Sequence, residues 1–183
     1  MRLTDTQMLA HWRRHRGLES LRSDCSVELF DGVDAGEVLR MEMRAWYLDL
    51  LDNAPLRFLS TTDIASRLSF APASAGVWRA SLPPDVRRLV AITVKGADAP
   101  VPVLAAGSDP RRESLNANPF SRSGPRHPSA FSHPDRTVTL CCASATMPEI
   151  VACSAIVDPG DETYQFDESA LGLLYNTTTP FNF

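Results

Sequence analysis

The hydrophobic residues change their spacing once along the chain, close to residue 77. Before this point they recur every three or four residues, which is the period of an amphipathic α-helix. After it they alternate with polar residues over short runs, which is the period of a β-strand. The pattern therefore predicts a helical first part and a β-rich second part.

Helices are expected over residues 4–16, 34–52, 62–68 and 167–175. The pattern is strongest over 34–52, where an aspartate and a glutamate at the start have the spacing of a capping box. The apolar residues of this helix form two adjoining faces: Val38, Met41, Ala45 and Leu48 on one, and Leu39, Met43, Trp46 and Leu50 on the other. A helix that is apolar around so much of its circumference is expected to be buried against more than one element.

Strands are expected over residues 77–82, 88–95, 100–104, 136–142 and 149–157. The third carries two prolines, which lack the N–H that a central strand needs, so it is expected at a sheet edge. Together with the helices, these strands predict an α+β fold. In it, a helical N-terminal part packs with a small antiparallel β-sheet domain and a short C-terminal helix. The segments are an N-terminal helical arm (1–17), a helical part (18–76), a β-rich part (77–175) and a C-terminal tail (176–183).

Residues 107–133, within the β-rich part, are rich in serine, proline, asparagine, arginine and glycine and are expected to form a long loop. Loops of this length in a domain are usually functional or become ordered against a partner. The arginines are expected to pair with carboxylates of a neighbouring copy, and contact with a phosphate backbone is the alternative. The residues expected at contacts with copies or partners are Trp12, Arg111, Arg112, Phe120, Arg122, Arg126, Phe181 and Phe183.

Composition narrows the classes of protein. The 183 residues suit one domain with or without an appended arm, and the net charge of −4 argues against a general nucleic-acid binder. The chain opens without the pattern of a secretory signal and has no apolar run of about 18 residues, so no membrane association is expected. The four cysteines are then expected to be reduced in the cytosol.

The sequence offers little evidence for catalysis, a metal or a cofactor. It contains no glycine-rich phosphate-binding motif. His11 and His15 have the i, i+4 spacing of metal ligands, but the three arginines near them oppose a cation. We therefore expect no bound metal and no cofactor.

The alternative function is that of a small cytosolic cysteine-dependent hydrolase. Cys141 or Cys142 would be the nucleophile, His127 or His133 the base, and Asp135 the residue that orients the base. Neighbouring residues of a strand point to opposite faces, so only one of the two thiols faces any given site. The segment also lacks the glycine-rich turn that usually builds an oxyanion hole.

The most distinctive stretch joins the two parts of the pattern, at residues 82–96. Two prolines fix the backbone, an aspartate follows that can cap a turn, and a β-branched strand begins after it. This corner is expected to set the angle between helices and sheet. Its residues are Leu82, Pro83, Pro84, Asp85, Arg88 and Leu89.

The corner resembles a pattern of tailed-bacteriophage connector proteins, the head–tail adaptor and tail-tubular proteins that stack as rings below the portal. Their pattern is L-P-x-D-hydrophobic-x-R-L, and the matching residues here are Leu82, Pro83, Asp85, Val86, Arg88 and Leu89. The order of predicted elements over residues 34–175 is also similar. A phenylalanine is often expected where Val86 stands.

The resemblance implies a non-enzymatic virion structural protein, a homo-oligomeric ring component of the phage head–tail connector. It would be made in the host cytoplasm and lie at the head–tail junction of the virion. Its implied partners are other copies of itself, the portal protein and tail proteins, with packaged DNA in the channel as a further candidate. A ring closed by rotation needs two different, complementary faces on each copy. An adaptor module that binds another protein is the third function considered.

Overall fold

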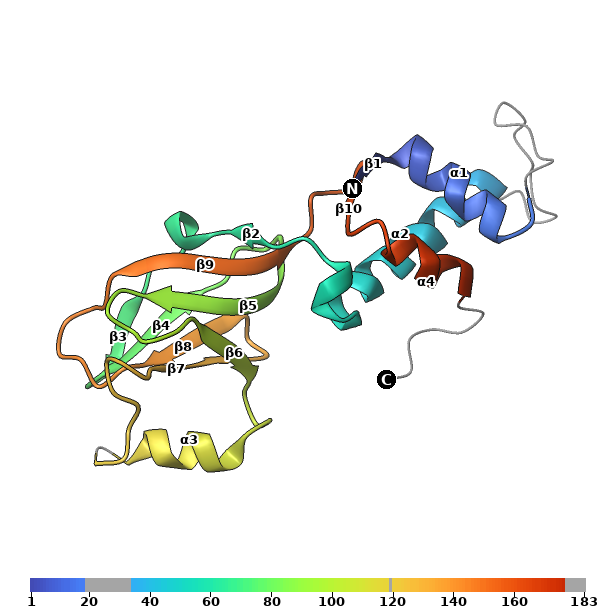
Figure 1. Cartoon of the computed structure of the whole chain (residues 1–183). Helices are drawn as coiled ribbons and strands as arrows, with labels where there is room; N and C mark the ends of the chain where they lie inside the picture. The colour runs from blue at the N-terminus through green and yellow to red at the C-terminus, as the bar shows by residue number, and fades with distance from the viewer. Residues whose placement is uncertain (19–33, 119, 177–183) are drawn as a thin grey trace. The chain divides into compact units, whose positions relative to one another are not determined.

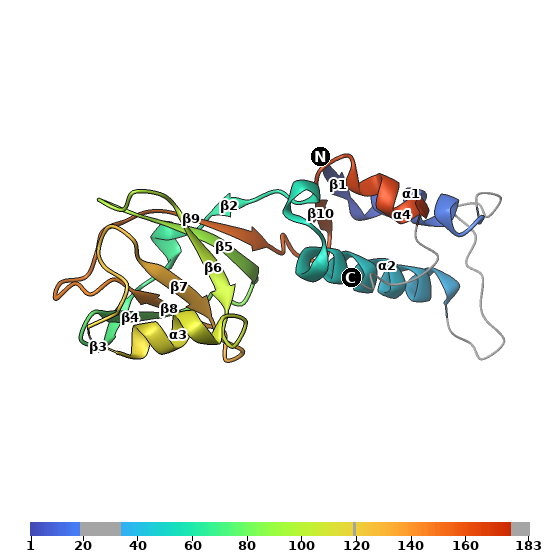
Figure 2. The ribbon, with the colours of Figure 1, turned by 60° about the horizontal axis from the view of Figure 1, so that its bottom comes forward.

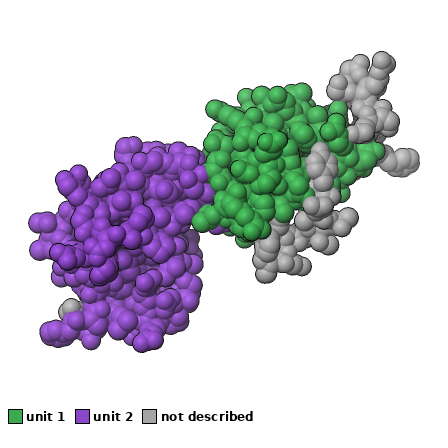
Figure 3. Space-filling view, viewed as in Figure 1, with its two compact units in different colours: residues 1–60, 158–183 green, residues 61–157 purple. Residues whose placement is uncertain are grey.

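The computed structural model describes residues 1–18, 34–118 and 120–176. The chain divides into two structural units, one made of residues 1–60 with 158–183 and the other of residues 61–157 (Figure 3). The second unit is thus inserted between the two segments of the first. The sequence predicted a division at residue 77, whereas the boundaries between the two units lie after Ser60 and after Val157.

The first unit holds most of the helical residues. Its elements are β1 (Arg2–Thr4), α1 (Asp5–His15), α2 (Ala35–Asn53), the 3-10 turn η1 (Leu56–Phe58), β10 (Thr163–Gln165) and α4 (Ala170–Asn176). Strands β1 and β10 pair in antiparallel fashion, with Leu3 opposite Tyr164. The helices at 4–16 and 34–52 are confirmed as α1 and α2.

The core of this unit forms where α2 meets β10. The ring of Tyr47 on α2 lies 4.9 Å from the ring of Tyr164 and 6.1 Å from that of Phe166, measured between centroids. All three side chains are fully buried. The Tyr47 hydroxyl accepts from the Gln165 backbone N–H at 2.8 Å and donates to the Gln165 carbonyl at 3.1 Å. This hydroxyl therefore ties the short strand to the long helix.

The second unit is an eight-stranded sheet. Its elements are β2 (Thr62–Asp63), the 3-10 turn η2 (Ala65–Arg67), β3 (Ala71–Ser74), β4 (Val77–Ser81), β5 (Val86–Val94), β6 (Val101–Ala105), α3 (Pro110–Ala117), β7 (Ser129–Ser132), β8 (Thr137–Cys141) and β9 (Ile150–Val157). The strand order is β2-β9-β5-β6-β7-β8-β4-β3. All neighbours are antiparallel except β6 and β7, which are parallel.

The sheet curls, so that β5 and β9 lie over β4 and β8 (Figures 1 and 2). The side chains between these two layers form the core of the unit, with Trp78, Ile92, Leu140 and Cys153 among them. Alternation along β4 accounts for its inner residues, because side chains at every second position point to the same face. The core thus arises from a sheet that folds back on itself.

The expected fold class is wrong. The sheet is large and mixed instead of small and antiparallel, and it begins at residue 62 instead of 77. The helix expected over 62–68 is replaced by β2 and η2. All four residues of β3 are exposed. An exposed edge strand needs no hydrophobic alternation, so the pattern used for prediction could not reveal it.

Two further elements were missed in the segment 107–133, which is not one long loop. It contains α3 and β7, and β7 pairs with both β6 and β8. Strand β6 consequently lies inside the sheet, between β5 and β7, where it was expected at an edge. No helix in the described part of the chain is long and apolar enough to cross a membrane.

Candidate interaction surfaces

One apolar face of α2 lies at the surface. Met41 is 72% exposed, Ala45 is exposed, and Val38 and Leu48 are half-buried. The opposite side of the helix buries Met43, Tyr47, Leu50 and Leu51 completely or nearly so. Within the described residues, the expectation that both apolar faces are buried is therefore wrong, because the first face lies at the surface of this unit.

The exposed face of α2 forms the floor of an open hollow of about 550 Å³. We call this hollow the α2 groove. Met41, Ala45 and Leu48 supply its apolar floor, and charged side chains from α1, α2 and the segment before β10 supply its rim. The rim residues are Asp5, Arg40, Arg44, Asp161 and Glu162, with Tyr164 beside them.

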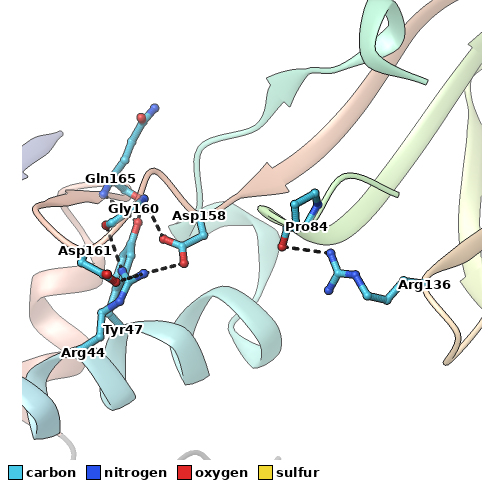
Figure 4. Close-up of polar contacts among 8 residues, drawn as sticks. All are labelled: Arg44, Tyr47, Pro84, Arg136, Asp158, Gly160, Asp161 and Gln165. Atoms are coloured by element: carbon cyan, nitrogen blue, oxygen red, sulfur yellow. Dashed lines mark hydrogen bonds and ion pairs between the residues drawn. The ribbon is translucent and has the colours of Figure 1, made fainter. Parts of the chain in front are cut away.

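The arginines of the groove already have acidic partners. The Arg44 guanidinium lies 2.6 Å from an Asp158 oxygen and 3.0 Å from an Asp161 oxygen, and it donates to the Gly160 carbonyl at 3.2 Å (Figure 4). Arg40 donates to Asp5 at 3.2 Å. These contacts hold the segment after β9 against α2.

Two carboxylates of the rim are exposed at the surface. The Asp161 side chain is 91% exposed although one oxygen contacts Arg44, and Glu162 is exposed as well. The lining holds two arginines and three carboxylates, so its charge is slightly negative. The groove therefore combines an apolar floor with an acidic rim, which suits an apolar ligand that carries positive charge.

A second surface lies on α3 and the turn after it. Asp109 caps this helix by accepting from the Arg112 backbone N–H at 3.0 Å, and Pro110 occupies its first turn. Arg111 and Arg112 are exposed. Leu115 is 47% exposed, and Phe120 is 99% exposed. We call the residues Arg111, Arg112, Leu115 and Phe120 the α3 patch.

Contacts within the chain order the α3 patch. The buried Asn116 side chain donates to the Arg112 carbonyl at 3.0 Å and to the Ser129 hydroxyl at 2.8 Å. Its oxygen accepts from the Ser123 backbone N–H at 2.9 Å. Asn116 thus fixes α3, the turn after it and β7 relative to one another.

Arg122 and Arg126, which were also predicted at contacts with copies or partners, lie outside the α3 patch. Arg122 donates to the Asn116 carbonyl at 2.9 Å and to the Ala75 carbonyl, so it supports the turn from inside the unit. Arg126 is exposed, and its carbonyl accepts from the Asp98 backbone N–H at 3.0 Å. Trp12 is buried, with its ring 5.9 Å from that of Trp46. Phe181 and Phe183 lie outside the described residues.

The proline corner lies within the sheet unit. It connects β4 with β5, so it joins two strands instead of setting an angle between helices and sheet. The Nη2 atom of Arg136 lies 2.7 to 3.1 Å from the carbonyl oxygens of Pro83, Pro84 and Val86, and Figure 4 shows the contact with Pro84. Asp85 accepts two hydrogen bonds from Arg67, at 2.9 and 2.5 Å.

The remaining corner residues differ in burial. Leu89 is buried in the core of the unit, and Leu82 packs against that core while half-exposed. Arg88 lies on β5 and is also half-buried. The contribution of Arg136 could not be predicted from local patterns, because its partners lie about fifty residues away along the chain.

The candidate thiols are buried. Burial raises the pKa of Cys141 and raises that of Cys153 to about 12. Cys142, which follows Cys141 in the sequence, is fully buried. The His133 Nε2 atom lies 2.8 Å from the Thr139 hydroxyl oxygen.

The other candidate residues of the hydrolase have partners of their own. The His127 ring lies 3.3 Å from an Asp98 oxygen. Asp135 accepts from the Thr137 hydroxyl and backbone N–H, and these bonds lower the pKa of its carboxyl. Each of these side chains thus contacts a neighbour other than a thiol.

No group of three or more histidine, cysteine or acidic residues in the described ranges could hold a metal ion. No protein-family model matches the sequence, and no curated protein matches it.

Proposed function

We propose that this protein is a non-enzymatic structural component of a tailed bacteriophage, and that its copies form a ring of the head–tail connector below the portal. Assembly into a ring is supported above all by Met41, which lies on a long helix and is 72% exposed. The phage assignment rests on the resemblance of the corner at residues 82–96.

The hydrophobic effect is the reason that the exposure of Met41 indicates an interaction. Water contact with a large apolar side chain is unfavourable, and an apolar surface with a polar rim marks an interaction site. The chain carries two such surfaces, and they differ: the α2 groove is hollow with an acidic rim, whereas the α3 patch protrudes and carries arginines. Association through two unlike surfaces is heterologous and generates rings or open chains of copies.

The state of the thiols supports a role without catalysis. A cysteine nucleophile acts as the thiolate, which requires a pKa close to or below the ambient pH. Burial shifts the pKa of Cys141 in the opposite direction. A hydrolase that used Cys141 as its nucleophile would have to lower the pKa of this thiol again.

The charge of the chain suits the proposed position. The net charge is −4, and a wall that lets DNA slide must avoid neutralising many phosphates. The proposed partners are the portal protein above, tail proteins below, and other copies alongside. Packaged DNA would pass through the channel without specific contacts.

Mass photometry over a range of protein concentrations tests the assembly. We expect the wild type to form species of several copies and Met41→Glu to shift them to monomers. Leu56→Glu is the matched control, because Leu56 is a similarly large, exposed residue of the same unit that lies outside the groove lining. A wild type that remains monomeric throughout, or equal assembly of Met41→Glu and wild type, would contradict the proposal.

A further inference from the structure

We propose that the α3 patch of one copy docks into the α2 groove of the next copy. This inference rests on the proposed function, since it names the contact that would repeat around the ring. It commits to one occupant of the groove, a second copy of this chain. Three properties of the described residues support it: apolar match, charge match and rigidity.

The apolar match concerns the most exposed side chains of the two surfaces. Phe120 is 99% exposed and Leu115 is exposed nearby on the same unit, so the patch presents one aromatic and one aliphatic side chain. The groove offers a floor of Met41, Ala45 and Leu48 beneath an open hollow. Methionine adapts its shape readily and makes favourable contacts with aromatic rings. Docking would bury the apolar surface of both copies together.

The charge match concerns the rim. Arg111 and Arg112 precede Leu115 by four and three residues, so all three share one face of α3. On the groove, Asp161 and Glu162 are exposed carboxylates. The groove arginines are already engaged by aspartates of their own chain, so they oppose an incoming arginine less than free ones would. Arginine on the patch and carboxylate on the rim are therefore complementary.

Both surfaces are held in place before docking. Asn116 fixes the turn that carries Phe120, and Arg44 fixes the segment that carries Asp161. Preorganised surfaces lose less conformational freedom on binding than flexible ones. The two surfaces also belong to different units of the chain, and each copy has one of each. The contact is thus head-to-tail.

A mixing experiment tests this head-to-tail contact. Met41→Glu damages the groove and leaves the patch intact, whereas Phe120→Asp damages the patch and leaves the groove intact. We expect each variant alone to associate roughly tenfold or more weakly than the wild type. Mixed in equal amounts, they should form one-to-one dimers that do not grow, because each dimer retains a single intact contact.

The matched control for the patch is Met147→Asp. Met147 is an exposed apolar residue of the same unit, outside the patch, and its variant should assemble like the wild type. Circular dichroism and thermal unfolding of every variant separate a lost contact from a lost fold. A mixture of the two folded damaged variants that stays monomeric would overturn the head-to-tail contact.

Charge exchange tests the rim. Arg111→Glu with Arg112→Glu should weaken assembly, and adding Glu162→Lys in the same chain should partly restore it, because this change leaves the ion pair of Arg44 with Asp161 in place. High salt should weaken assembly of the wild type, because exposed charges are screened. Failure of the restored variant to assemble better than the arginine variant would overturn the assigned pairing.

The outcomes separate this inference from the proposed function. If the wild type forms rings and Phe120→Asp forms them equally well, the docking pair is wrong and the ring proposal stands. If the wild type forms no species larger than a monomer, the ring proposal is wrong, and the docking inference that rests on it is wrong as well. If the arginine variant assembles normally but loses affinity for duplex DNA of random sequence, α3 is a nucleic-acid surface and the inference is overturned.

Discussion

Gly76 occupies a backbone position that leaves no room for a side chain. Its φ angle is +72°, and a Cβ atom there would lie 2.6 Å from the Cα of Ala143 and 3.0 Å from its nitrogen. We expect Gly76→Ala to lower the free energy of unfolding by about 2–4 kcal/mol, from the left-handed backbone and the clash together. Urea denaturation measures the loss.

Gly96 provides the matched control for that substitution. Its φ angle is +84°, but a Cβ atom there would meet nothing within 4 Å. Gly96→Ala should therefore cost only the backbone contribution, about 1–2 kcal/mol. Equal losses for the two variants would show that the close approach of Ala143 has no energetic weight.

Arg136 combines a strained backbone with a stabilising side chain. Its φ angle is +60°, and its guanidinium donates to the carbonyls of Pro83, Pro84 and Val86 within the proline corner. Arg136→Ala should lose about 1.5–3 kcal/mol of stability through the missing charged hydrogen bonds. Arg136→Gly loses the same bonds but relieves the backbone, so it should be about 1 kcal/mol more stable than Arg136→Ala. Alanine and glycine variants of equal stability in urea would contradict the assigned strain.

Two buried tyrosines predict a loss of stability at alkaline pH. Burial raises the pKa of Tyr47 and of Tyr164 from 10.0 to about 12. Below pH 10, which is the pKa of tyrosine in the unfolded chain, both tyrosines are neutral and their full contribution to the free energy of unfolding is present. As the pH rises from 10 towards 12, the unfolded chain ionises more readily than the folded one, and this contribution is lost. Urea midpoints should therefore fall across this window. Tyr47→Phe should be less stable at neutral pH but lose less across the window, and an unchanged slope would contradict the assignment.

At the scale of elements, α3 depends on one buried amide. Asn116→Ala removes the bonds to Arg112, Ser123 and Ser129 together. We expect a loss of about 1–3 kcal/mol, since buried partners are left unpaired, and faster hydrogen exchange over residues 116–123. Assembly should weaken as well, because Phe120 loses its fixed position. Unchanged exchange over this range would show that other contacts order the turn.

Hydrophobic alternation identified the strands that build the core. The predicted runs at 77–82, 136–142 and 149–157 correspond to β4, β8 and β9. Strand β4 buries every second residue, whereas four consecutive residues of β8 are buried. Short strands such as β1 and β3 lack this signal. A partner strand supplies the hydrogen bonds of each: β1 pairs with the distant β10, and β3 pairs with β4, which follows it directly.

Local signals for α3 were present in the sequence. An aspartate at the cap followed by Pro110 is a common start of a helix. The surrounding serine, proline and glycine content outweighed these signals and led to the prediction of a loop. The parallel pairing of β6 with β7 had no local signal, because it joins residues that α3 separates.

At the scale of the whole molecule, the insertion of one unit into the other escaped prediction. Strands β1 and β10 pair although almost the entire chain separates them, and periodicity carries no information about such pairs. The apolar faces of α2 were identified from the sequence, but periodicity cannot tell which face meets its own chain. We assign the exposed face, with Met41 at its centre, to contact with another copy.

We propose that copies of this protein close into a ring through unlike surfaces. Negative-stain electron microscopy of the concentrated wild-type protein would make such a ring visible. The ring proposal predicts closed particles of uniform diameter with a central channel, absent from the Met41→Glu sample and retained in Leu56→Glu. Monomers alone, or open chains of variable length, would contradict it.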